Sequence, residues 1–91
     1  MSENSLKSLD FFMFVKEEHV SYLIGSKGLT ISTLSKESST KIIVMPPIVE
    51  LNYRAVKITG THQNICQASR LVQSLLAKKL NTINYFKQKN A

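Results

Sequence analysis

The fold is decided by the stretch Val20-Ser21-Tyr22-Leu23-Ile24-Gly25-Ser26-Lys27-Gly28-Leu29-Thr30-Ile31 of this 91-residue chain. Within it, Gly25 and Gly28 enclose a serine and a lysine, and apolar residues at helical spacing lie on both sides. Glycine lets the backbone turn sharply and leaves room for a ligand to approach the backbone N–H groups. Because Lys27 adds a positive charge, a loop of this kind at the start of a helix suits a phosphate. The loop alone does not say whether that phosphate belongs to a nucleotide or to a nucleic acid.

Outward from the loop, hydrophobic spacing predicts the other elements. They are, in chain order, a strand at residues 11–15, a short helix ending at Gly25, a second helix after Gly28, strands at 41–45 and 55–59, and a long helix at 62–80. The aromatic run at 11–15 is interpreted as a largely buried strand rather than as a surface on which bases stack. The predicted order is therefore β-α-α-β-β-α.

This order, with a Gly-x-x-Gly between the first two helices, resembles the type I KH domain, a module that binds single-stranded RNA or DNA. The resemblance extends from about Phe12 to Leu80. It implies an α+β fold in which a three-stranded antiparallel sheet packs on three helices. We expect a flexible leader over residues 1–9, the KH domain over 10–80, and a basic extension over 81–91 that either continues the last helix or packs on the sheet.

Three features depart from the family pattern. Ser21, followed by Tyr22, stands where a small glycine often precedes the apolar pair that ends the first helix. Ser38-Ser39 replaces the Thr-Gly that often closes the second helix, which removes a preferred left-handed stop. Leu29 occupies a position that is often basic, so one phosphate contact of the family is expected to be missing. These departures bear on affinity and sequence preference more than on the fold.

Charge is distributed unevenly along the chain. Its 12 basic and 6 acidic residues give a formal net charge of +6, and all the acids precede Leu51. A second half that is basic and contains no acidic residue is typical of a protein that binds a polyanion such as nucleic acid or a membrane surface. A solvated basic face that only keeps the domain soluble has the same composition, so charge by itself leaves both interpretations open.

Several other classes of protein are excluded by patterns that the sequence lacks. No apolar run of about 18 residues predicts a membrane span, and the N-terminus has no signal-peptide pattern. The single cysteine, Cys66, cannot form an internal disulfide, which favours a reducing, intracellular location in the nucleus, the cytoplasm or both. His19 and His62 have no metal-ligand spacing with it. Neither a nucleophile elbow nor a nucleotide-binding fingerprint is present, so we expect no enzyme activity, metal or cofactor.

The resemblance also implies a binding site in two parts. Backbone N–H groups and the start of the second helix would hold the phosphates of about four nucleotides. The residues expected there are Gly25, Ser26, Lys27, Gly28 and Leu29. Apolar side chains would form the floor of a narrow groove that suits pyrimidines, without aromatic stacking. The residues expected there are Val20, Ile24, Ile31, Ile42 and Ile43.

Two basic residues match positions that recognise cytosine in several type I KH domains. They are Lys41 and Arg54, at the starts of the second and third strands. The arginine is well suited because its rigid fork can donate to cytosine O2 and N3 together.

The expected function is sequence-selective binding of single-stranded RNA, or of single-stranded DNA, with a C-containing core tetranucleotide. Splicing, stability and translation of mRNA are all compatible with such a module. The alternative is a degenerate KH module that acts in protein interaction or dimerisation through the Phe11-Phe12 edge and the last helix. A homodimer or neighbouring domains of a larger protein would add specificity to the RNA-binding function.

Overall fold

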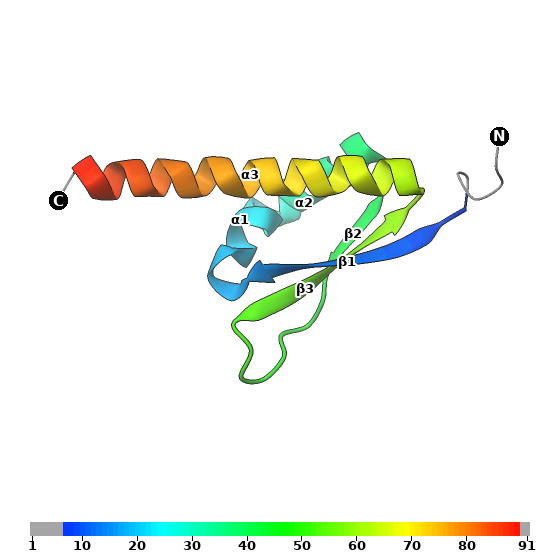
Figure 1. Ribbon diagram of the computed structural model, residues 1–91, viewed down its shortest axis with the longest axis horizontal. Helices are drawn as coiled ribbons and strands as arrows, with labels where there is room; N and C mark the ends of the chain where they lie inside the picture. Colours follow the sequence, from blue (N-terminus) through cyan, green and yellow to red (C-terminus); the bar gives the residue numbers. More distant parts are fainter. Residues whose placement is uncertain (1–6, 90–91) are drawn as a thin grey trace.

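The computed structural model describes residues 7–89, with side chains described through residue 80. Its elements are β1 (Leu9–Lys16), the 3-10 turn η2 (Glu17–His19), α1 (Val20–Ile24), the 3-10 turn η3 (Ser26–Gly28), α2 (Leu29–Ser38), β2 (Lys41–Val44), β3 (Tyr53–Gly60) and α3 (His62–Lys89). The predicted order β-α-α-β-β-α is confirmed (Figure 1).

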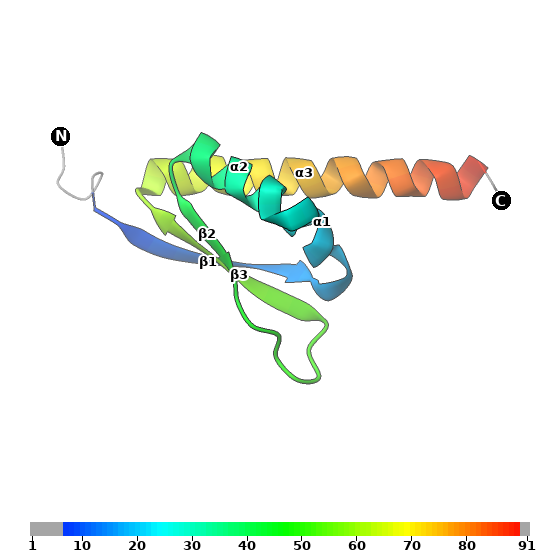
Figure 2. The same ribbon diagram turned by 180° about the vertical axis from the view of Figure 1, so that it is seen from behind.

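The strands form one antiparallel sheet in the order β1-β3-β2, so β3 lies in the centre. Leu9 faces Gly60 at one end of the β1–β3 pair, and Lys16 faces Tyr53 at the other. The helices cover one side of this sheet (Figures 1 and 2). The predicted architecture, an α+β fold with a three-stranded antiparallel sheet packed on three helices, is therefore confirmed.

The core lies between the helices and every second residue of the strands. In β3, Val56 and Ile58 are fully buried, and Val15 of β1 is 3% exposed. The helices contribute buried residues that are three or four positions apart within α1 and α3: Val20 and Leu23 from α1, Leu34 from α2, and Ile65, Ala68 and Val72 from α3. Burying one such aliphatic side chain stabilises a fold by about 1.5–3 kcal/mol. The apolar stripe expected on the last helix is confirmed by α3.

The aromatic run of β1 is not buried, and that expectation was wrong. Phe11 is 41%, Phe12 50% and Phe14 65% exposed. Successive side chains of a strand point to opposite faces, and the helices cover only one face of this sheet. Phe12 and Phe14 lie three positions and one position before the buried Val15, so their side chains point to the opposite, uncovered face.

The two ends of the chain are described only in part. Residues 1–6 of the expected leader lie outside the described residues, and Leu9 already belongs to β1. In the expected extension over 81–91, α3 continues to Lys89, so the backbone there follows the helix. No helix in the described part of the chain is long and apolar enough to cross a lipid bilayer.

The end of α2 shows how the fold accommodates the missing glycine. Ser39 adopts the left-handed conformation, with φ 55° and ψ 41°. The N–H of Thr40 donates to the Ser35 carbonyl at 3.0 Å, which closes a Schellman-type cap. Behind it, the buried Ser38 Oγ donates to the Leu34 carbonyl at 2.7 Å. A serine thus makes the αL stop that glycine usually makes.

We predict that Ser39→Gly stabilises the domain by about 1 kcal/mol, because glycine adopts positive φ without steric cost. Thermal unfolding should show a rise in Tm of roughly 4–8 °C. The control Ser38→Ala removes a buried hydroxyl that bonds a helix carbonyl, and it should lower Tm instead. A Tm unchanged or lowered by Ser39→Gly would show that the left-handed cap carries no strain.

Candidate nucleic-acid interface

The loop between α1 and α2 is built from an unusual run of backbone conformations. Gly25 has φ 74° and ψ 179°, Lys27 has φ 55° and ψ 27°, and Gly28 has φ 74° and ψ 13°. Three of four consecutive residues therefore have positive φ, which side-chain-bearing residues rarely adopt. This run folds the chain back sharply, so that α2 starts directly after the turn η3.

The two glycines serve different purposes. A Cβ on Gly25 would lie 2.6 Å from Thr30 Cβ and 3.0 Å from the Thr30 backbone nitrogen, so the first turn of α2 packs against the bare Gly25 backbone. A Cβ on Gly28 would meet nothing within 4 Å. Gly25 is therefore a packing requirement inside the loop, whereas Gly28 leaves open space beside the start of α2.

Backbone donors and positive charge lie next to Gly28 in the chain. Ser26 and Lys27 open the turn η3, so their N–H groups have no carbonyl partner within it. The positive end of the α2 dipole lies at Leu29, immediately after Gly28. The side chains of Ser26 and Lys27 are exposed. The loop thus combines backbone N–H groups, an exposed hydroxyl and an exposed ammonium group within four consecutive residues, with open space at Gly28, and groups of these kinds suit a phosphate.

The apolar residues expected to form a groove floor are divided between two layers. Ile24 and Ile31 are half-buried beside the loop and pack against the core. Val20 and Ile42 are only 5% and 7% exposed, so they support this surface from beneath. Leu29, at 69% exposure, is the apolar side chain nearest the loop that is mostly in solvent. Direct apolar contact with a base is therefore open to Ile24 and Ile31 more than to Val20 or Ile42.

Lys41 and Ile43 lie on the other face of β2. Ile42 is buried toward the helices, and strand side chains alternate, so Lys41 and Ile43 point to the uncovered face of the sheet. Because β2 is an edge strand, the long Lys41 side chain has room to bend around that edge. The structure does not place Lys41 or Ile43 beside Ile24 and Ile31.

Arg54 lies at the start of β3, on the face that the helices cover, as do Val56 and Ile58. Its guanidinium donates from Nε to Glu17 Oε2 at 2.9 Å and from Nη2 to Glu17 Oε1 at 2.7 Å. This bidentate pair is partly exposed, with side-chain exposures of 20% for Arg54 and 45% for Glu17. Such a pair is worth about 1 kcal/mol or less, so it orients Arg54 without locking it.

Glu17 is a neighbour of Arg54 that the sequence did not indicate. It meets Arg54 because the Glu17 N–H donates to the Asn52 carbonyl at 2.8 Å, which extends the β1–β3 ladder by one residue pair. Only the register between two strands distant in sequence brings these residues together.

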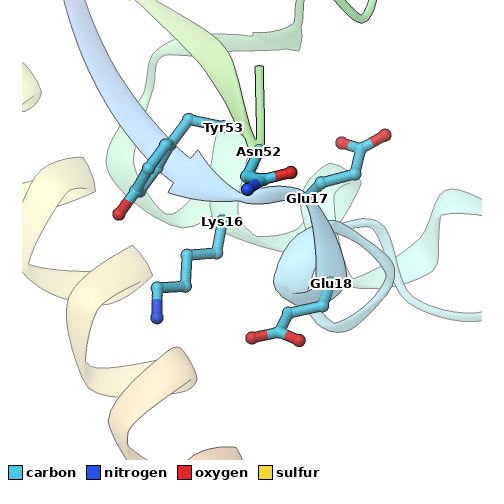
Figure 3. A pocket seen from close by; sticks show the side chains of 5 residues that line it. All are labelled: Lys16, Glu17, Glu18, Asn52 and Tyr53. Atoms are coloured by element: carbon cyan, nitrogen blue, oxygen red, sulfur yellow. The ribbon is translucent and has the colours of Figure 1, made fainter. Parts of the chain in front are cut away.

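A hollow of about 520 Å³ lies where β1 ends and β3 begins. It is lined by Lys16, Glu17, Glu18, Asn52 and Tyr53 (Figure 3). Of its two carboxylates, Glu17 is already paired with Arg54 and Glu18 remains beside the Lys16 ammonium group. None of the residues Gly25 to Gly28 lines this hollow, so it is separate from the glycine loop.

Comparison with known proteins agrees with this geometry. The family model of the KH domain matches residues 11–74. The chain belongs to the KH domain family. This KH domain is 38% identical over 65 residues to the heterogeneous nuclear rnp K-like protein 2 of Lachancea thermotolerans, a match that covers 71% of this chain and 22% of that protein. The chain thus spans about a fifth of that relative's length.

The fold also matches a solved type I domain. The solution structure of the first KH type I domain of human vigilin superposes with a TM-score of 0.67 at 27% identity, over 82% of this chain and 78% of that one. A type I KH domain is a module that binds single-stranded nucleic acid and is not an enzyme fold. The resemblance carried by Gly25-Ser26-Lys27-Gly28 and the order of elements is therefore confirmed.

We predict that alanine has unequal effects at the two glycines. Gly25→Ala combines a glycine-only backbone conformation with a clash against Thr30, and it should destabilise the fold by about 3 kcal/mol or more. Gly28→Ala has open space and should cost only about 1 kcal/mol for its positive φ. Urea unfolding of both variants measures the difference. Equal free energies of unfolding would mean that the Thr30 contact is not a packing requirement.

Proposed function

We propose that this KH domain binds a single-stranded RNA segment of about four nucleotides with a pyrimidine-rich, cytosine-containing core. The observation that carries the proposal is the loop Gly25-Ser26-Lys27-Gly28, which combines a positive-φ backbone, an exposed lysine and open space at Gly28 directly before α2. The match to a protein whose name describes a heterogeneous nuclear ribonucleoprotein supports RNA as the polymer. The acid-free basic second half of the chain supports a polyanion of either kind.

The first step of binding is capture of the phosphates. The N–H groups of Ser26 and Lys27 and the positive end of α2 supply partial charges, while the Lys27 ammonium supplies a full one. Leu29 adds no charge, so fewer ionic contacts are made than in a domain that is basic at this position. Binding should therefore be moderate in strength and only moderately dependent on salt, with a slope of about 0.7 log units per ionic phosphate contact.

The second step is base selection beside the loop. Ile24 and Ile31 offer half-buried apolar contacts that fit the flat face of a small base. Arg54 would then read the edge of a cytosine. Glu17 occupies its Nε–Nη2 side, and this leaves the Nη1–Nη2 end of the fork with two donors that match cytosine O2 and N3. Lys41 would contribute from the edge of β2 as a flexible charge.

In the cell, the proposed role is post-transcriptional control of mRNA, through splicing, stability or translation, in the nucleus, the cytoplasm or both. One KH domain contacts few bases, so additional domains or a second copy would supply the remaining specificity. We assign binding to the domain at residues 10–80, and the basic extension at 81–91 would add attraction to the RNA backbone.

We predict that the double substitution Ser26→Asp with Lys27→Asp abolishes binding to a C-rich RNA without changing thermal stability. Asp tolerates the left-handed conformation of residue 27 better than most residues, so the loop should keep its shape. The new carboxylates would repel the phosphate that the loop is proposed to hold. Fluorescence anisotropy with a labelled oligonucleotide, together with Tm, measures both effects.

The matched control is Gln67→Asp with Arg70→Asp on α3. Both residues are exposed, and the pair changes the net charge by the same three units as the loop variant. It should lower affinity only slightly through the overall field. If both double variants weaken binding equally, attraction is general and the loop is not a specific phosphate site.

We predict that Arg54→Lys removes the preference for cytosine over uracil while keeping most of the affinity. Lysine retains the charge but lacks the planar fork that two base acceptors require. The expected loss is about tenfold in the affinity ratio between C-core and U-core RNAs, which is typical for one bidentate contact. The ratio is measured by titrating paired oligonucleotides that differ at one position.

Two further variants interpret the result. Arg54→Ala should lose the same cytosine preference as Arg54→Lys and some affinity as well. Glu17→Gln keeps Arg54 but weakens the ion pair that orients it, so it should lower the preference by a smaller factor. If Arg54→Lys binds like the unmodified domain at every sequence, Arg54 is a backbone contact and not a base reader.

A further inference from the structure

The face of the sheet that the helices leave uncovered carries three aromatic side chains (Figures 1 and 2). Phe12 and Phe14 of β1 and Tyr53 of β3 are 50%, 65% and 47% exposed. Strand residues alternate between the two faces, and Val15 and Val56 are buried beneath the helices, so these three rings lie on the opposite face. An exposed group of large apolar side chains of this kind marks a binding surface.

The strand register places the three rings next to one another. Phe12 and Phe14 are alternate residues of β1, so their Cα atoms are about 7 Å apart. Ala55 of β3 directly faces Phe14, and Tyr53 is the next residue of β3 on this face. Tyr53 is therefore the diagonal neighbour of Phe14. Because Ala55 has no side-chain atom beyond Cβ, it does not cover either ring, and the three aromatics form one accessible row.

A positive charge lies at the centre of the same face. Lys57 belongs to the central strand β3, where it directly faces Phe12 of β1 on one side and Ile43 of β2 on the other. It is half-buried, so its stem packs among these neighbours while its ammonium group stays in contact with water. The aromatic row and this lysine therefore belong to a single surface.

The corners of the face add more basic than acidic groups. Lys16 ends β1 and Lys41 begins β2, and both are exposed. In the three described strands, this face has one acid, Asp10, whose carboxylate accepts a hydrogen bond from Thr59 Oγ1 at 2.7 Å. Glu18 lines the same hollow as Lys16 and offsets its charge at that corner. The rest of the face is positive.

Aromatic rings with a lysine among them fit a single-stranded nucleic acid better than a protein. Lysine is depleted from the buried centres of protein–protein interfaces, because its ammonium group would lose water there without gaining a partner. A single strand uses both kinds of group at once, since each base has a flat face that stacks on a ring and each phosphate attracts an ammonium group. The position of Lys57 beside Phe12 therefore favours nucleic acid as the ligand.

We propose that the uncovered face of the sheet is a second binding surface for single-stranded nucleic acid, on which two or three bases stack on Phe12, Phe14 and Tyr53 while Lys57 attracts a phosphate. The proposal rests on the proposed function for the polymer but not for the site, because the glycine loop joins two helices on the other side of the sheet (Figure 2). Every base has a flat face, so this surface accepts any sequence.

Stacking of two or three bases is weak by itself, and it gains strength when the same strand also occupies the loop. A core held at the loop keeps the rest of its strand near the face at a high effective concentration. A tail of about twelve uridines extends at least about 40 Å at a spacing of 3.4 Å per nucleotide, and the two shorter dimensions of the molecule are 29 Å and 22 Å. Such a tail is long enough to reach around the sheet.

We predict that a tail of about twelve uridines raises the affinity of a C-containing tetranucleotide for the domain by about tenfold, and that this gain depends on the rings. Phe14→Leu keeps an apolar side chain but removes the stacking surface, so it should remove most of the gain and leave the affinity for the untailed tetranucleotide unchanged. Phe14→Tyr keeps the ring and should keep the gain. Fluorescence anisotropy with tailed and untailed RNAs measures both affinities.

The matched control is Phe11→Leu. Phe11 is 41% exposed and adjacent to Phe12, but it directly faces the buried Ile58 and so lies on the helix side of the sheet. The same substitution there should leave the gain intact. Lys57→Gln should lower the salt dependence of binding to the tailed RNA by about 0.7 log units, and Lys79→Gln on α3 should leave it nearly unchanged. Tm of each variant separates loss of a contact from loss of fold.

NMR signals of the aromatic rings test the face without the loop. The variant with Ser26→Asp and Lys27→Asp no longer attracts a phosphate to the loop, so a response to oligouridine comes from another surface. Addition of a uridine oligonucleotide at about millimolar concentration should shift the ring protons of Phe12 and Phe14 upfield, because a stacked base shields them. The ring protons of Phe11 should not move.

Three results would overturn the proposal. The first is that the rings of Phe12 and Phe14 do not respond to oligouridine, whether or not the tetranucleotide binds. The second is a gain from the tail that Phe11→Leu lowers as much as Phe14→Leu does. The third is a ring shift that follows the protein concentration instead of the RNA concentration, which would assign the face to a protein contact. Rings that respond while the tetranucleotide fails to bind would support this surface and reject the loop site alone.

Discussion

The missing side chain at Gly25 is the constraint on which the site depends. The backbone there takes φ 74° and ψ 179°, and the first turn of α2 lies so close that a Cβ would meet both Thr30 Cβ and the Thr30 nitrogen. With the chain reversed this tightly, α2 begins directly after η3. In the proposed function, the backbone donors of this loop would be held in place by the packing of Gly25 before the ligand arrives, so little ordering entropy would oppose binding.

A second constraint is that the three helices cover only one face of the sheet. The central strand β3 is fully buried on the helix side at Val56 and Ile58. Its neighbour β1 has Val15 on that side and two phenylalanines on the other. A domain of this size has too few residues to cover both faces of a sheet, because the buried fraction of surface is smaller in shorter chains. The uncovered face therefore follows from the same shortage of chain that leaves the glycine loop accessible.

The sequence predicts those features that depend on local spacing. The stripe of Ile65, Ala68 and Val72 defines α3, and two glycines three residues apart define the loop, because helix periodicity and positive φ leave direct marks in the residue order. The exposure of Phe12 and Phe14 was missed for the opposite reason. An unbroken apolar run has the same pattern whether its strand is covered on one face or on two, and only the arrangement of the helices distinguishes the cases.

Long-range register explains the other features that the sequence did not reveal. Glu17 and Arg54 are 37 residues apart, and they meet only because Val15 faces Arg54 across the β1–β3 ladder. The left-handed Ser39 was missed for a different reason, because the sequence offers no glycine at this helix end. A fold that is stabilised by its core tolerates a strained cap that costs about 1–2 kcal/mol. Sequence rules describe the preferred residue at each position, whereas the structure shows which preferences the packing overrides.

If Arg54 reads a base as proposed, the Glu17–Arg54 pair would connect stability with recognition. A carboxylate beside an RNA-binding surface repels phosphates, so its presence needs a compensating effect. Glu17 would provide one by holding the Nε–Nη2 side of the guanidinium, which orients the fork and leaves its Nη1–Nη2 end unbonded to Glu17. An arginine that is already oriented loses less side-chain entropy on binding, about 0.5–1.5 kcal/mol for a long side chain. This smaller entropy loss is comparable in free energy to the weak repulsion expected from a half-exposed carboxylate in water. Selectivity for the base can therefore be gained with little loss of affinity for the RNA backbone.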